Sequence, residues 1–175
     1  MLGRTDSGSK LVEAHPRVGL ALGLRIVSVT FPITFMIGVL DGISPYFGLY
    51  LVSVRGMHGI EVGAYESFLA VIRYALTPVA LFSVSYFMGK GLDVRDSLRA
   101  IAGCILLSGF VGSSIGQGLG YSIMAGLVQA PTDLLFTVVS SMFNGLLSAV
   151  ALFFVSFSAV AIASVRKRGA KPSSP

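Results

Sequence analysis

The sequence has few charged residues, a single cysteine and no tryptophan. Only 12% of its residues are charged, whereas a soluble domain has about 25%. The chain therefore lacks the composition of an ordinary soluble domain. Cys104 stands alone in an apolar run, so it can form neither an intramolecular disulfide nor a cysteine metal site. Without tryptophan, tyrosine is left to supply aromatic anchors at a membrane surface.

The motifs of the common enzyme classes are missing as well. No G-K-[ST] follows the glycine-rich stretch, which excludes a Walker A phosphate loop. H-E-x-x-H and C-x-x-C are absent. The run SGFVGSS at residues 108–114 only echoes a nucleophile elbow, and both histidines lie elsewhere in the sequence. We therefore expect no enzymatic activity, no catalytic residue, no cofactor and no metal; an enzyme acting on lipid is the least favoured alternative.

Apolar sequence is what the chain has in abundance. Of its residues 54% are hydrophobic, and the mean hydropathy is +0.82. Apolar runs of about 20 residues predict membrane-spanning helices, because a helix satisfies its own backbone in lipid. The sequence predicts an all-α polytopic transmembrane helical bundle with about four spans, six being the alternative. The expected parts are a soluble N-terminal tail, 1–17, a single transmembrane domain, 18–165, with spans at about 18–40, 67–89, 98–120 and 134–165, and a basic cytoplasmic tail, 166–175.

The stretch between the first two spans is harder to interpret. Asp41 to Pro45 combines Asp, Gly, Ser and Pro, which is the chemistry of a turn, and predicts a break in the chain. Residues 46–54 are apolar but too few to span a membrane as a helix. A short re-entrant or interfacial segment is therefore expected near 43–54, and the form of residues 41–66 stays open.

A face of small residues organises the third span. Ser108, Gly112, Gly116 and Gly120 follow one another at intervals of four, so they share one face of a helix. A face with almost no side chains lets a neighbouring helix approach closely in a membrane. The last span has a similar face in Ser141, Gly145 and Ala149, and we expect the two faces to pack together. A pore-lining glycine face is the alternative.

The basic residues predict the orientation. Ten of the 13 lysines and arginines lie in three groups, at residues 4–17, 90–99 and 166–171. With four spans, all three groups fall on one side, and positive charge stays cytoplasmic. Both termini are therefore expected inside an integral protein of the cell (cytoplasmic) membrane. The net charge of +5 is then explained by topology and does not indicate a nucleic-acid partner.

A few polar residues within the apolar runs are candidates for function, because a charge at mid-bilayer costs roughly 2.5–3.5 kcal/mol or more. On one helix, Glu66 and Arg73 would lie two turns apart on the same face and could pair. The candidate polar path or ion pair consists of Glu66, Arg73, Gln117 and Asn144. One alternative is a metal or proton site formed by Asp41, His58, Glu61 and Glu66, and another is a solvated loop.

The sequence favours a non-enzymatic subunit of a larger membrane complex, with the lipid bilayer and other membrane subunits as partners. The alternative is a small transporter or channel component whose polar path binds a small molecule or an ion. In size and apolarity the chain resembles the membrane-embedded substrate-binding subunits of energy-coupling-factor vitamin transporters. That resemblance concerns architecture alone and extends to no motif.

Overall fold

The computed structural model describes residues 8–90 and 94–169, and every regular element in those ranges is a helix. The elements are α1 (Gly8–Ser53), α2 (Ile60–Val71), η1 (Ile72–Leu76), α3 (Thr77–Lys90), α4 (Val94–Leu127) and α5 (Leu134–Gly169). The turn η1 is a π-helix that joins α2 to α3 without a break. Four stretches within the described residues are long and apolar enough to cross a membrane: Gly23–Ser53, Ile60–Gly89, Ala102–Leu127 and Leu134–Ala163. The expected all-helical architecture with four such helices is confirmed.

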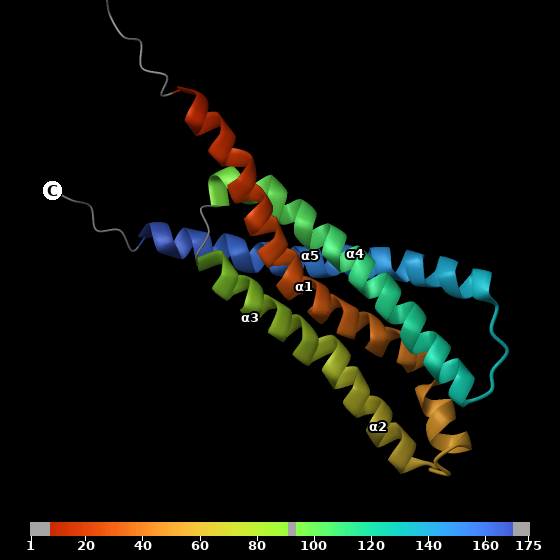
Figure 1. The fold of residues 1–175 in the computed structure, drawn as a ribbon. Coiled ribbons are helices and arrows are strands. Elements are labelled where there is room, and N and C mark those ends of the chain that lie inside the picture. The colour runs from red at the N-terminus through yellow and green to blue at the C-terminus, as the bar shows by residue number, and fades with distance from the viewer. Residues whose placement is uncertain (1–7, 91–93, 170–175) are drawn as a thin grey trace, which may run out of the picture.

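Helix α1 is longer than the sequence predicted. It begins at Gly8, so residues 8–17 of the expected tail are helical, and residues 1–7 lie outside the described residues. It also continues through Pro45 to Ser53, so the predicted break and the separate segment near 43–54 are wrong. The last turns of α1, drawn in orange in Figure 1, change direction relative to the rest of the helix. A proline inside a helix produces such a bend, because it removes one backbone hydrogen bond.

A short turn connects α1 to the second candidate span. Gly56 and Gly59 have φ values of 64° and 59°, a region that glycine enters without steric penalty. The next helix then starts at Ile60 and not near residue 67. The polar residues before 67 therefore belong to the helix itself, and only residues 54–59 form the turn.

Helix α4 packs between α1 and α5, and its glycine face lies against α1 (Figure 1). A β-carbon added at Gly112 would lie 3.1 Å from both Phe31 O and Phe35 N, and one at Gly116 would lie 2.9 Å from Val39 N. Two hydroxyls add polar contacts to this seam: Thr34 donates to the Ser108 carbonyl at 3.0 Å, and Thr30 shares a hydrogen bond with the Ser108 hydroxyl at 2.7 Å. We call this contact the α1–α4 seam.

The predicted partner of the glycine face was therefore wrong. The small face of α5 does pack on α4, but on other residues. A β-carbon at Gly145 would lie 2.9 Å from Ser114 N, and one at Gly118 would lie 3.5 Å from the Ser141 hydroxyl. Ala149 faces Gly109 in the same way. Helix α4 thus has two small-residue contacts, and the sequence pattern at intervals of four revealed only the one toward α1.

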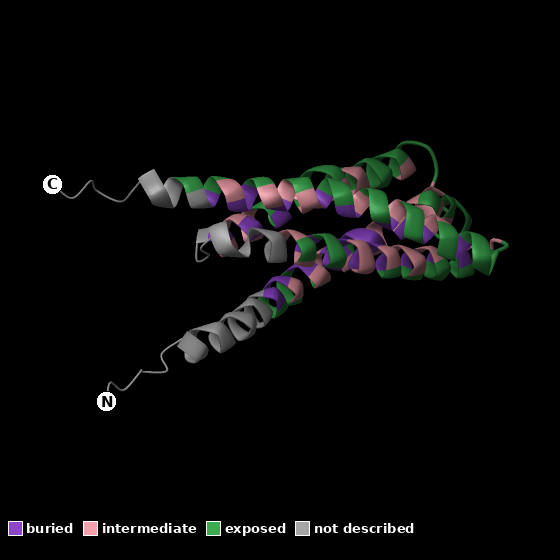
Figure 2. Ribbon diagram, turned by 90° about the horizontal axis from the view of Figure 1, so that it is seen from above, coloured by how far each residue is buried: buried purple, intermediate pink, exposed green. Residues whose placement is uncertain are grey.

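The C-terminal half of the second span, α3, is packed against other helices, whereas its N-terminal half, α2 with η1, contains no buried residue. In α3, Leu81 is buried and contacts Ile37 of α1 and Leu152 of α5. Further along, a β-carbon at Gly89 would lie 3.0 Å from the Val160 α-carbon. In contrast, α2 and η1 contain no buried residue. Figure 2 shows the consequence, with buried residues concentrated along the facing sides of the long helices.

Candidate functional site

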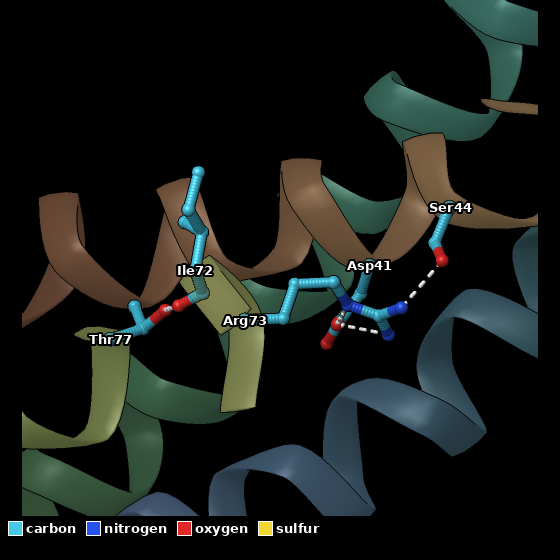
Figure 3. Close-up of polar contacts among 5 residues, drawn as sticks. All are labelled: Asp41, Ser44, Ile72, Arg73 and Thr77. Atoms are coloured by element: carbon cyan, nitrogen blue, oxygen red, sulfur yellow. Dashed lines mark hydrogen bonds and ion pairs between the residues drawn. The ribbon is translucent and has the colours of Figure 1, made fainter. Parts of the chain in front are cut away.

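An ion pair between α1 and η1 is the most distinctive polar feature of the described chain. The guanidinium of Arg73 donates from Nη2 and Nε to Asp41 Oδ1, at 2.6 and 2.8 Å, and from Nη1 to Ser44 Oγ at 2.5 Å. Figure 3 shows Arg73 reaching from η1 across to the two residues of α1. The side chains of Arg73 and Asp41 are only 16% and 21% exposed. We call these three residues the Arg73 cluster.

The Arg73 cluster lies deep in the apolar part of the molecule. Asp41 is within one helical turn of the midpoint of the candidate span Gly23–Ser53, and Arg73 is within one turn of the midpoint of Ile60–Gly89. Each of the three guanidinium nitrogens donates to an oxygen of Asp41 or Ser44. Every nitrogen of the guanidinium group therefore has an oxygen acceptor, and all of these acceptors come from the neighbouring helix α1.

The π-turn that carries Arg73 lies directly before a proline. Pro78 has no backbone N–H, and a proline ring inside a helix crowds the carbonyl one turn before it. The N–H of Thr77 donates to the carbonyl of Ile72, five residues back, and the Thr77 hydroxyl donates to the same carbonyl (Figure 3). A π-turn inserts one extra residue into the helix and shifts the facing of everything before it, and such turns are frequent at functional sites. Here it sets the direction in which Arg73 leaves the helix.

The same stretch of α1 is fixed on its other side by α4. A β-carbon at Gly42 would lie 2.6 Å from Tyr121 N, so this glycine permits a backbone approach next to Asp41. One turn further, the hydroxyls of Tyr46 and Tyr121 are 2.9 Å apart and their ring centroids 5.1 Å. The α1 residues of the cluster thus lie on a helix that is packed against α4, whereas Arg73 comes from a helix segment with no buried residue.

The structure separates the four residues of the predicted polar path. Glu66 does not pair with Arg73, whose acidic partner is Asp41. Glu66 is exposed on α2, and its carboxylate lies beside Gly48 of α1. Gln117 is half-buried on α4, and Asn144 donates to Ser140 on its own helix at 3.3 Å. Within the described ranges, no hydrogen bond or ion pair joins any two of these four residues.

The alternative of a metal site receives no support from the geometry. Among the described residues, no group of three or more His, Cys, Asp or Glu side chains is placed to hold a metal ion. His58 is exposed in the turn between α1 and α2, and Glu61 is exposed in the first turn of α2. Asp41 is committed to the Arg73 cluster. The four residues of the proposed metal site therefore lie in different parts of the structure.

Several buried serines on α3, α4 and α5 are a feature that the sequence did not single out. The hydroxyls of Ser85, Ser113, Ser114 and Ser156 are buried and have no hydrogen-bond partner within the described chain. Ser114 is the serine of a literal G-x-S-x-G string, residues 112–116, but it lies inside the continuous helix α4. A nucleophile elbow requires a sharp strand-to-helix turn, so this string is not one.

Comparison with known proteins adds no assignment to this geometry. No known protein family matches the chain, and neither a curated protein nor a solved structure matches it.

Proposed function

We propose that this protein is a multi-pass integral protein of the cell membrane and acts as a non-enzymatic subunit of a larger membrane complex. Four apolar helices of membrane-spanning length support the first part. The three groups of basic residues support an orientation with both termini in the cytoplasm. The ion pair, the tyrosine pair and the serines are contacts between helices or buried hydroxyls, and no two of the proposed path residues come together.

The observation that carries the subunit role is the poor burial of the second span. In the most apolar stretch of this span only 6% of the residues are buried, whereas the corresponding share is 33% in each of the other three spans. A helix in a bundle normally buries one face against its neighbours. Helix α2 buries none of its residues and presents Phe68 at 64% exposure, while Tyr74 in η1 is 72% exposed. A helix from another subunit would supply the neighbour that this segment lacks.

Site-specific photo-crosslinking in intact membranes tests this role. A photoreactive amino acid replaces Phe68 on α2 or, as a matched control, Phe143 on α5, which is 63% exposed. We expect a discrete protein adduct from position 68, identified by mass spectrometry, and lipid adducts alone from position 143. Lipid adducts alone from both positions would show that the segment faces the bilayer and would overturn the subunit proposal.

A second candidate function is supported by the Arg73 cluster. An ionisable residue inside a membrane is by default a candidate for a substrate or ion pathway, and this one sits in a π-turn. On that reading the protein is a transporter or channel component, and a small molecule or ion competes for one member of the pair. Native mass spectrometry of the protein and of its Arg73→Gln variant tests it. A bound small molecule that the variant loses would favour this function over the subunit role.

A further inference from the structure

We propose that the Asp41–Arg73 ion pair is a latch that holds the half-helix α2 against α1, and that the π-turn η1 is the hinge on which α2 opens. This inference does not rest on the subunit role or on transport. It follows from three properties of the second span: one half is anchored, the other is not, and the two meet at an irregular turn.

The anchored half is α3. Leu81 is 1% exposed and Ser85 is 2% exposed, so both side chains are buried. Gly89 allows the backbone of α3 to approach Val160 and Ala163 of α5 at close range. Small residues at such a seam permit tight helix packing, which resists separation. The second half of the span therefore stays in place when the first half moves.

The unanchored half is α2 together with η1. Neither contains a buried residue. Among the described residues, the hydrogen bonds and the ion pair that tie this segment to α1 all belong to the Arg73 cluster, and the exposed Glu66 carboxylate also approaches Gly48. The turn before α2 contains Gly56 and Gly59, both at positive φ and both with open space around the α-carbon. Segments with few buried contacts open most readily, so the ion pair is the main restraint on α2.

The hinge is the π-turn. Converting it to a regular α-turn removes the extra residue, which rotates the preceding helix by about 100° around its axis. That rotation carries Arg73 away from the face of α1 that holds Asp41 and Ser44. The closed form gives up the regular α-helical bonding at Thr77, whose N–H donates to Ile72 O instead. The closed form gains the ion pair in exchange.

Pulsed dipolar spectroscopy of spin-labelled protein in lipid nanodiscs tests the latch. Cys104 is replaced by Ala, and one label pair is placed at Leu49 on α1 and Phe68 on α2, both exposed. A second pair at Phe82 on α3 and Phe154 on α5 reports on the anchored half. The variants are Asp41→Asn, Arg73→Gln, the charge exchange Asp41→Arg with Arg73→Asp, and Glu66→Gln as the control for loss of a charge on α2.

We expect a longer-distance population between positions 49 and 68 in Asp41→Asn and in Arg73→Gln, with the charge exchange restoring much of the short distance. Glu66→Gln should resemble the parent. The distance between positions 82 and 154 should not change in any variant. An unchanged 49–68 distance in both single variants would overturn the latch. Equal lengthening in Glu66→Gln, or lengthening of the 82–154 distance, would overturn it as well, because opening would then be neither specific nor localised.

Discussion

At the scale of single residues, the glycines of α4 are required wherever another backbone occupies the position of their missing side chain. A β-carbon at Gly116 would lie 2.9 Å from Val39 N and 3.1 Å from the Phe35 carbonyl carbon. Backbone atoms of a packed helix cannot rotate away as a flexible side chain does. By contrast, a β-carbon at Gly103 or Gly126, on the same helix, meets nothing within 4 Å. The helix therefore contains both required and replaceable glycines.

We predict that Gly116→Leu destabilises the protein, because the side chain must force α1 and α4 apart. Overpacking of this kind costs about 1–3 kcal/mol and occasionally more. The measurement is the thermal unfolding midpoint in mild detergent. Gly103→Leu is the matched control and should be as stable as the parent or slightly more so, because leucine favours a helix more than glycine does. A Gly116→Leu protein as stable as Gly103→Leu would contradict the α1–α4 seam.

The residues from Asp41 to Pro45 show why local sequence patterns misled the prediction. Their sequence predicts a turn, because Asp, Gly, Ser and Pro favour turns. Instead, Asp41 and Ser44 bind Arg73, and Gly42 admits the backbone of α4. These roles depend on residues at least 29 positions away, and no local pattern carries that information. For the same reason the sequence offered Glu66 as the partner of Arg73, since it was the acidic residue nearest in the expected helix.

At the scale of helices, composition predicted which stretches are helical, but it did not predict which of them touch. The existence of four apolar helices followed from hydropathy and length alone. The partner of the glycine face did not, because α1 and α5 both offer small or backbone-accessible faces to α4. Adjacency in the chain favoured α5, yet the glycine face of α4 packs on α1.

The start of α5 yields a prediction at this scale. Asp133 Oδ1 accepts from the backbone N–H of Leu135 at 2.9 Å and of Phe136 at 3.3 Å, so it caps the helix. Asp133→Ala removes the acceptor and should lower the free energy of unfolding by about 1 kcal/mol. Asp133→Asn keeps an acceptor oxygen and should lose much less. Chemical denaturation in detergent measures both, and equal losses for the two variants would show that the negative charge matters more than the cap.

At the scale of the whole molecule, four candidate spans place the two ends of the described chain on the same side of the bundle. The start of α1 and the end of α5 lie toward the same end, opposite the α1–α2 turn and the α4–α5 turn (Figure 1). This arrangement agrees with the distribution of basic residues, from which we infer that this end faces the cytoplasm.

We predict that reporters fused near Ser9 and after Pro175 are both active in the cytoplasm. A reporter inserted at His58, in the exposed turn between α1 and α2, should be active on the opposite side. Paired alkaline phosphatase and fluorescent protein fusions, each active on one side only, make the measurement. The topology is wrong if either terminal fusion reports the outer side, or if the insertion at position 58 reports the cytoplasm.

The hydroxyls of the α1–α4 seam bear on the order in which the protein is made. Thr34 and Ser108 are 74 residues apart, so α1 is translated long before the helix it packs against. Yet each hydroxyl also has an acceptor within α1: Thr30 Oγ1 lies 2.8 Å from Ile26 O, and Thr34 Oγ1 lies 3.0 Å from Thr30 O, which can accept its one proton until the Ser108 carbonyl is in place. A chain inserted one helix at a time thus delivers α1 to lipid with these hydroxyls satisfied. The first helix can therefore be complete before Ser108 and the glycines after it have been synthesised.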